Sequence, residues 1–384
     1  MTKKWSSRLT FFAFVVLMVG LGSNDSLRGI FSTIFQEHFS LTTTQLGLIV
    51  TASYIGNLVF LLVGGNLSTR FSKKRVLQVL ILIWMAALAL FAFTSNYTVL
   101  LIGMALALGS STLLNTTMNL ITPLLFATAP GFFVNFLFFT QEIGTSGSQY
   151  ILGSHADGFA FWQHTNLVLL ILGAVAFVLL LFCNVPEEAA APADAPAQKG
   201  GYDWRIIVPY VLVFGFYFIA EHGVMNWMVA YGVDGLGLPQ ASAAKYLSVF
   251  FGGMMIGRLC LSPLVDKLGA LKSLAAFGGV SCVLYLIGSL GGAVTMPVWA
   301  ISGLSFSILY PTLVMSIRLY FPAQQVSGAA GTILSIASLA DILFNVGFGK
   351  LVDMTGYAVS IRVLPLSALA FFIVFMLFTK FCKP

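Results

Sequence analysis

Residues 76–141 read VLQVLILIWMAALALFAFTSNYTVLLIGMALALGSSTLLNTTMNLITPLLFATAPGFFVNFLFFTQ, and none of them is Asp, Glu, Lys or Arg. An uncharged run of this length exceeds any element of a soluble core, whereas about 20 apolar residues suffice to cross the hydrocarbon layer of a bilayer. The stretch therefore predicts several membrane-spanning helices in succession.

The rest of the 384-residue chain has the same character. Hydrophobic residues make up 58% of it, and the 19 basic and 13 acidic residues together make up only 8%. A typical soluble chain carries roughly 25% charged residues, and a surface facing water cannot be built from so few. We therefore expect an all-α membrane protein.

The apolar segments predict twelve transmembrane helices joined by short connections. The first segment carries polar residues and runs past the length of a signal-peptide core, so we expect it to remain as the first helix. The expected spans lie near residues 9–36, 44–67, 76–94, 98–127, 132–153, 166–183, 205–232, 243–263, 271–290, 296–320, 327–349 and 358–380.

Positive charges are distributed unequally between the connections. With a cytoplasmic N-terminus, 14 of the 19 basic residues fall on the cytoplasmic side, many of them near the N-terminus, in residues 70–75, and at Lys267 and Lys272. This positive-inside bias predicts an inner-membrane protein with both termini in the cytoplasm. It also accounts for the net charge of +6 without a nucleic-acid partner. The four cysteines lack metal-binding spacing.

Residues 184–204 read NVPEEAAAPADAPAQKGGYDW and predict a flexible cytoplasmic linker. The linker separates an N-terminal domain, residues 1–183, from a C-terminal domain, residues 205–384, each with six expected helices. A shift of 197 positions places the second half on the first. Pairs related by this shift include Leu41 and Leu238, Leu67 and Leu264, Arg70 and Lys267, Arg75 and Lys272, Asn24 and Glu221, and Asp25 and His222.

Such a repeat is expected where a substrate site lies at the repeat interface, although chance similarity between Gly- and Leu-rich helices is the alternative. Residues 65–75, GNLSTRFSKKR, resemble the helix 2–3 signature G-x-L-a-D-r-x-G-r-k of the major facilitator superfamily. Residues 262–269, SPLVDKLG, resemble the same motif and keep its Asp and second Gly. Thr69 and Ser72 replace these two residues in the first copy.

This resemblance implies the major facilitator fold, with two pseudo-symmetric six-helix bundles and alternating access to a central cavity. It implies a cytoplasmic gate formed by Gly65, Arg70, Asp266, Lys267 and Gly269.

Four shorter motifs resemble the fucose–proton symporter subfamily. They are Asn24-Asp25 with the following turn, residues 114–119 (LNTTMN), residues 135–144, and residues 307–312 (SILYPT). Asn115 stands where that subfamily carries an acid. The resemblance implies proton-coupled import of a sugar, with Asp25 as a proton-binding carboxyl.

Ionisable residues inside the spans are the candidates for coupling, because each costs about 2.5–3.5 kcal/mol near the bilayer centre. The predicted proton-coupling residues are Asp25, Glu142 and Glu221. Asp25 and Arg28 share a helix face, so a purely structural ion pair is the alternative for Asp25. Glu142 or Glu221 could replace the acid missing at Asn115, or one acid could suffice.

Three further ionisable residues are ambiguous. Asp341 is either a cavity acid or the partner of a basic residue. Arg258 pairs with Asp266 or reaches the membrane interface. Glu221 and His222 are adjacent and point about 100° apart, so only one of them faces the cavity squarely.

Uncharged polar residues within apolar helices predict a polar cavity. Sugars are bound by amides and hydroxyls beside an aromatic platform, for which Tyr217, Trp227 and Tyr231 are candidates. Hydrogen bonds between helices, worth about 0.6 kcal/mol each, are the alternative. The predicted substrate-binding residues are Asn24, Arg28, Asn115, Asn119, Gln141, Asn226, Trp227, Tyr310, Asp341 and Asn345.

No phosphate-binding loop, metal-binding or hydrolase motif is present, so we expect neither ATP use, nor a cofactor, nor enzyme activity. The expected energy source is the proton gradient, with Na⁺ left open. We expect a monomer, surrounded by lipid, that imports a small polar solute such as a monosaccharide. A drug–proton antiporter of the same fold is the alternative, which the 35 Phe residues would suit.

Overall fold

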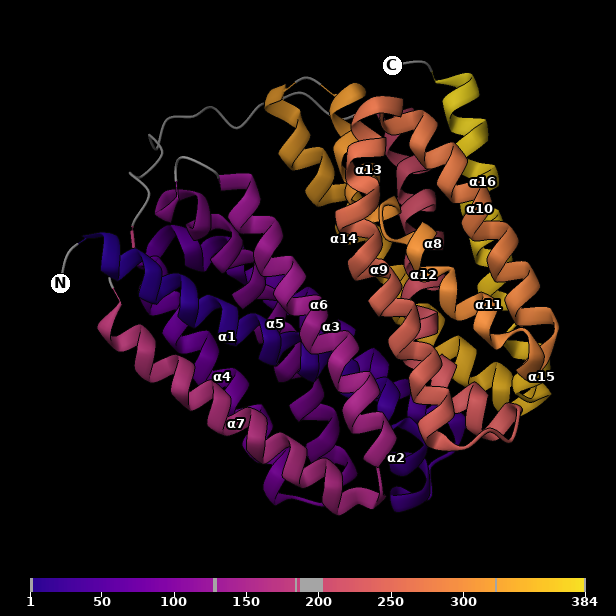
Figure 1. The fold of residues 1–384 in the computed structure, drawn as a ribbon, viewed down its shortest axis with the longest axis horizontal. Coiled ribbons are helices and arrows are strands. Elements are labelled where there is room, and N and C mark those ends of the chain that lie inside the picture. Colours follow the sequence, from indigo (N-terminus) through magenta and orange to yellow (C-terminus); the bar gives the residue numbers. More distant parts are fainter. Residues whose placement is uncertain (1–2, 127–129, 184, 187–202, 322, 383–384) are drawn as a thin grey trace. The chain divides into compact units, whose positions relative to one another are not determined.

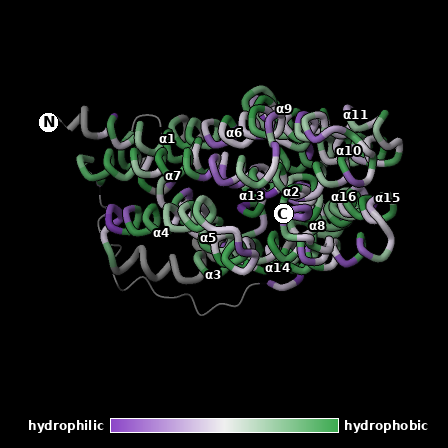
Figure 2. The backbone as a smooth tube through the Cα atoms, turned by 90° about the horizontal axis from the view of Figure 1, so that it is seen from below, coloured by the Kyte–Doolittle hydropathy of each residue, from purple (hydrophilic) through white to green (hydrophobic). Residues whose placement is uncertain are grey.

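The computed structural model describes residues 3–126, 130–183, 185–186, 203–321 and 323–382, and every regular element in these ranges is a helix (Figure 1). Ten helical segments among the described residues are long and apolar enough to cross a membrane. Figure 2 shows hydrophobic residues along most of these segments. The expected all-α membrane fold is confirmed.

The chain forms two compact units. Unit 1 comprises residues 1–40, 48–148 and 156–199, and unit 2 comprises residues 41–47, 149–155 and 200–384. Most of the expected linker, residues 184–204, lies outside the described residues.

Helices α1 to α7 supply unit 1, except for the beginning of α3 and the end of α6, which belong to unit 2. Helix α4 packs against α5 and α7, and α1 packs against the same two helices. The first expected span is interrupted at Phe31, where the Ser32 hydroxyl donates to the carbonyl of Gly29 at 2.8 Å. The helices are α1 (Lys3–Ile30), α2 (Ser32–Phe39), α3 (Thr43–Arg70), α4 (Lys73–Phe93), α5 (Tyr97–Leu125), α6 (Pro130–His155) and α7 (Gly158–Phe182).

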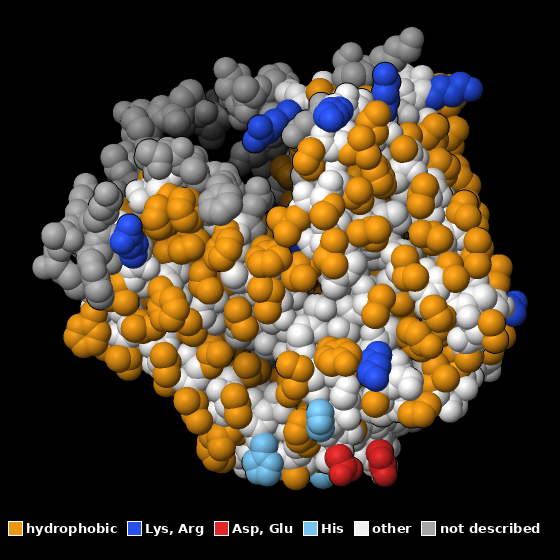
Figure 3. Space-filling model, in the orientation of Figure 1, with side chains coloured by type: hydrophobic (Ala, Val, Ile, Leu, Met, Phe, Trp, Pro, Cys, Tyr) orange, Lys and Arg blue, Asp and Glu red, His pale blue; other side chains and the backbone are white. Residues whose placement is uncertain are grey.

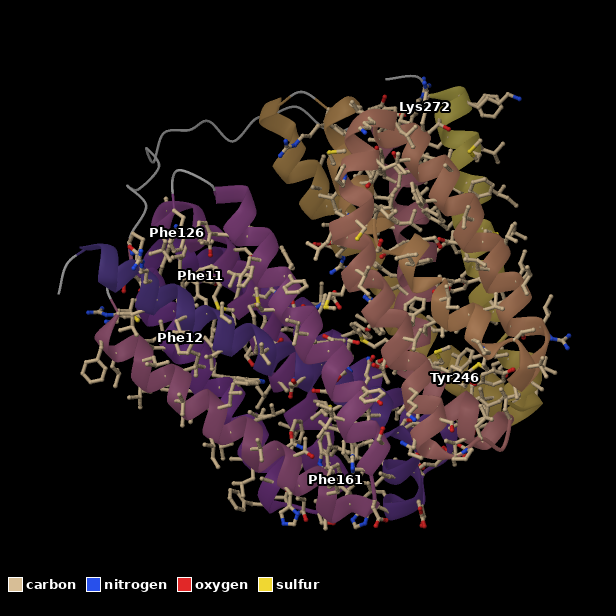
Figure 4. All side chains as sticks on the ribbon, in the orientation of Figure 1. Phe11, Phe12, Phe126, Phe161, Tyr246 and Lys272 are labelled. Carbon is tan, nitrogen blue, oxygen red and sulfur yellow. The ribbon has the colours of Figure 1, made fainter. Side chains whose placement is uncertain are left out.

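Hydrophobic side chains are spread over the whole described part of the face seen in Figure 3, whereas charged side chains are few there. Phe12 is 56% exposed and Phe182 is 70% exposed. Phe11, next to Phe12, instead packs on Phe126 and Phe133, with ring centroids 5.1 Å apart in both pairs (Figure 4). Many exposed large apolar side chains are expected where lipid surrounds the protein.

In unit 2, α8 packs against α14 and α16, and α9 packs against α11 and α12. Helix α8 continues into a π-helical turn at Tyr231–Gly235. The helices are α8 (Trp204–Ala230), α9 (Gln240–Leu268), α10 (Ala270–Leu290), α11 (Met296–Ile301), α12 (Gly303–Phe306), α13 (Leu309–Ser316), α14 (Ala323–Thr355), α15 (Tyr357–Ser360) and α16 (Val363–Phe381), with 3-10 turns at Gly292–Val294 and Ile317–Leu319.

The expected span 296–320 is a chain of short helices, α11, α12 and α13, rather than one continuous helix. Serine hydroxyls donate to carbonyls three residues earlier at the breaks: Ser302 to Trp299 at 2.5 Å, and Ser307 to Leu304 at 2.7 Å. These bonds satisfy backbone groups that the membrane interior cannot hydrate.

The two copies of the repeated loop motif make different turns. Gly269 ends α9 with φ at 80°, and its N–H donates to the Val265 carbonyl at 2.9 Å. That positive φ favours glycine. In the first copy, Ser72 has φ at −59°, and its hydroxyl caps α4 by accepting from the Arg75 N–H. The replacement of Gly by Ser therefore accompanies a change of turn.

Candidate functional site

The polar residues of unit 1 are brought together by a close crossing of α1 and α6. A Cβ at Gly22 would lie 2.0 Å from the Gln141 carbonyl oxygen, and one at Gly144 would lie 2.1 Å from the Val19 carbonyl oxygen. Only glycine permits this approach of the two backbones. Asp25 lies less than one turn beyond Gly22 on α1, and Gln141 of α6 lies at the crossing itself.

Asp25 accepts hydrogen bonds from two neighbours. Ser111 on α5 places its hydroxyl 3.3 Å from each carboxyl oxygen, and the Asn24 amide donates at 3.4 Å. Arg28, one turn further along α1, interacts electrostatically with the carboxyl. Arg28 is 6% exposed, and its guanidinium lies 5.5 Å from the centre of the Tyr54 ring. The pair thus combines a partly exposed acid with a buried base.

A chain of amides continues from this acid. The side-chain amide of Asn119 donates to the side-chain oxygen Oδ1 of Asn115 at 2.6 Å, and the amide of Asn115 donates to the side-chain oxygen Oε1 of Gln141 at 2.7 Å. Ser111, Asn115 and Asn119 recur at every fourth position and therefore share one face of α5. We call Asn24, Asp25, Arg28, Ser111, Asn115, Asn119 and Gln141 the unit 1 polar site.

All members of this site except Ser111 are among the residues expected from the sequence. Ser111 was missed because a serine in a helix is common, although its four-residue spacing from Asn115 was a usable signal. Glu142 follows Gln141 on α6 and is partly exposed. Adjacent helical residues point about 100° apart, so Glu142 projects in a different direction from Gln141.

The remaining candidates with described side chains lie in unit 2. Trp227 donates from its indole nitrogen to the Asn345 amide oxygen at 2.8 Å, and both residues are fully buried. This bond joins α8 to α14. Asn226 is 2% exposed. Tyr310 is partly exposed and stacks on Tyr217, with centroids 6.0 Å apart.

Glu221 on α8 is 9% exposed and interacts electrostatically with Tyr217, Tyr285 and Tyr310. Arg258, on α9, interacts with Tyr217 and Tyr310 as well. The sequence offered no signal for this arrangement, because its members lie on different helices. It is a second polar group, and it lies in unit 2.

The expected gate is only partly described. Lys267 is exposed at the end of α9, and Gly269 forms the turn reported above. Positions 65 and 70 fall in α3, position 266 in α9 and position 341 in α14. The side chains of Arg70, Asp266 and Asp341, and the surroundings of Gly65, lie outside the described part of the chain.

A bundle of membrane helices with acids and amides inside it is typical of a transporter. The sequence profile of the Major Facilitator Superfamily matches residues 10–343. The chain belongs to this superfamily, as its repeated loop motif indicates.

Curated relatives include the L-fucose-proton symporter of Escherichia coli, 24% identical over 75% of both chains. The glucose/galactose transporter of Brucella abortus is 27% identical over 83% of this chain and 81% of its own length. The hexuronate transporter of Bacillus subtilis is 26% identical over 86% of this chain and 84% of its own length. The solved xylose transporter of E. coli, in an inward-open conformation, is 14% identical and covers 97% of this chain and 95% of that one, with a TM-score of 0.79. This likeness confirms the expected twelve-helix fold.

Proposed function

We propose that this protein imports a monosaccharide together with a proton. The observation that carries the proposal is that Asp25 interacts with a buried base, Arg28, and accepts from Ser111, which shares one face of α5 with the amides Asn115 and Asn119. The names of the curated relatives support a sugar as cargo. We further propose an inner-membrane monomer with both termini in the cytoplasm.

Proton binding changes the charge and the hydrogen-bonding capacity of the Asp25 carboxyl. The ionised carboxyl is compensated by Arg28 and accepts from Ser111 and Asn24. Protonation removes that charge and turns the carboxyl into a hydrogen-bond donor. The unit 1 polar site therefore presents different hydrogen-bonding groups in its two protonation states, and this difference links proton binding to ligand binding.

The amide chain supplies the recognition of hydroxyl groups. Each Asn or Gln amide has two donor hydrogens and a carbonyl oxygen with two lone pairs. The bonds Asn119 to Asn115 to Gln141 use only part of this capacity and hold the three side chains in one orientation. Preorganised amides of this kind bind a sugar hydroxyl at a lower entropic cost than mobile ones.

The first test replaces the coupling acid. Asp25→Asn keeps the size of the side chain but cannot take up a proton, so uphill uptake of L-fucose or D-galactose into proteoliposomes should fall at least 10-fold. Exchange of labelled for unlabelled sugar, which needs no gradient, should persist. The matched control is Asp157→Asn, an exposed residue before α7 whose side chain makes no capping bond.

Retained uphill uptake in Asp25→Asn would remove the coupling role. Sugar added to de-energised vesicles should also alkalinise the external medium. Acidification would indicate antiport, and a requirement for Na⁺ without a pH change would indicate a different coupling ion. Glu142→Gln measured alongside tests whether α6 supplies a second acid.

A further inference from the structure

Glu221 lies in the middle of α8, and several aromatic side chains surround it. Tyr217 precedes it by one turn and shares its helix face. The Tyr285 hydroxyl, from α10, donates to the Ala220 carbonyl at 3.2 Å, which brings that ring next to Glu221. A third ring, Tyr310 from α13, stacks on Tyr217 at an interplanar angle of 29°. Three helices thus converge on one buried carboxyl.

The opposite charge comes from a fourth helix. Arg258 on α9 interacts electrostatically with Tyr217 and Tyr310, as Glu221 does. His222, next to Glu221, stacks on Phe218 with centroids 5.3 Å apart. We call Tyr217, Glu221, Arg258, Tyr285 and Tyr310 the Glu221 cluster.

Exposure is graded across the Glu221 cluster. Tyr217 and Tyr285 are fully buried and Glu221 is 9% exposed, whereas Arg258 and Tyr310 are partly exposed. Within the cluster, Arg258 and Tyr310 are therefore the members that a ligand can reach most easily. Charged groups this deep in a membrane protein are expensive, and they are kept where they bind a ligand or each other.

We propose that the Glu221 cluster is a second ligand subsite that binds the hydroxyl groups of an uncharged sugar and disfavours a sugar acid. This inference rests on the proposed function. It gives Glu221 a ligand-binding role in place of the proton-coupling role expected from the sequence.

The chemistry of the cluster fits such a ligand. A carboxylate accepts strong hydrogen bonds from hydroxyl groups, the Arg258 guanidinium and the phenols donate to sugar oxygens, and the face of Tyr310 packs against C–H groups. One acid and one base leave no surplus positive charge for an anion. A second carboxylate beside Glu221 would meet a like charge in a poorly solvated place, which selects against uronates.

The test measures affinity in the purified, reconstituted protein without a gradient, by calorimetry with L-fucose, D-galactose and D-galacturonate. Glu221→Gln removes the charged acceptor, so affinity for the neutral sugars should fall about 10-fold. Affinity for D-galacturonate should hold or rise, since the repulsion is gone. Arg258→Lys, which loses the planar guanidinium donors, should weaken the binding of neutral sugars severalfold. Arg318→Lys, at an exposed cation after α13, is the matched control.

If Glu221 had only a structural role, Glu221→Gln would lower the affinities for all three sugars together. Equal losses for neutral and acidic sugars would therefore contradict the proposed subsite. Neutral-sugar affinities in Glu221→Gln within twofold of the unmodified protein overturn it as well. At saturating sugar this variant should still accumulate sugar uphill; abolished accumulation with unchanged affinity would return Glu221 to proton coupling. If the unmodified protein binds neither neutral sugar, the proposed function fails and the subsite fails with it.

Discussion

At the scale of single residues, the unit 1 polar site depends on side chains that hold one another. Ser111 reaches both oxygens of Asp25, and Asn115 bonds on both sides, to Asn119 and to Gln141. Removing a side chain from the middle of such a chain leaves two partners unpaired, whereas removing the last member leaves one.

This difference predicts a graded effect. Asn119→Ala should raise the KM for sugar exchange about threefold, because a single interhelical bond is worth about 0.6 kcal/mol. Asn115→Ala should raise it more, because it leaves Gln141 and Asn119 without their partner. Exchange kinetics in proteoliposomes measure both values. Equal effects on KM, or a larger effect of Asn119→Ala, would contradict the central position of Asn115 in the amide chain.

At the scale of helices, the crossing of α1 and α6 brings the two helices that carry Asp25 and Gln141 together. Gly144→Leu would force a side chain into the Val19 carbonyl, so we expect a large loss of thermal stability or failure to fold. Gly147 lies on the same helix, and a Cβ there meets no atom within 4 Å. Gly147→Leu is therefore the control and should be close to neutral. Thermal unfolding followed by size-exclusion chromatography compares the two variants.

The first turn of α3 is capped by a side chain from another helix. The Asp353 carboxyl accepts from the N–H groups of Thr43 and Thr44, each at 2.8 Å, within unit 2. Asp353 thus caps α3, which has no acidic residue in its first turn. Because backbone N–H groups at a helix start need acceptors, Asp353 stabilises the first turn of α3 from α14.

Asp353→Ala should destabilise the protein by about 1 kcal/mol, the usual cost of losing a helix cap. It should also speed proteolysis in residues 40–44. Asp157→Ala is the control, because Asp157 precedes α7 without making a capping bond. Thermal midpoints and mass-spectrometric mapping of the cleavage sites check the expectation. Equal midpoints for the two variants would contradict it.

At the scale of the whole molecule, the positive-inside bias predicts the sidedness of each connection. Phosphatase fused after Leu290 should be active outside the cytoplasm, whereas fusion at Gly269 should be inactive. A fluorescent protein that matures only in the cytoplasm should fluoresce when fused to the C-terminus. The reverse pattern would invert the topology.

Hydropathy and a doubled loop motif were enough to predict the fold, because lipid imposes long apolar helices whatever their function. Hydropathy does not register backbone breaks, so the division of residues 296–319 into short helices was not foreseen. Most of the unit 1 polar site was predictable, since a polar residue in an apolar helix is conspicuous. The mutual bond of Trp227 and Asn345 was not, because pairing across helices leaves no pattern in one sequence.

The pairing of Asp25 with Arg28 has an electrical consequence. With Asp25 ionised the pair is neutral, and with Asp25 protonated it carries one positive charge. Inward movement of the loaded carrier with an uncharged sugar would therefore be driven by an interior-negative membrane potential, at about 2.3 kcal/mol per 100 mV. Return of the empty carrier would be indifferent to voltage. A potassium diffusion potential set by valinomycin should thus accelerate sugar uptake but leave the rate at which the empty carrier returns unchanged.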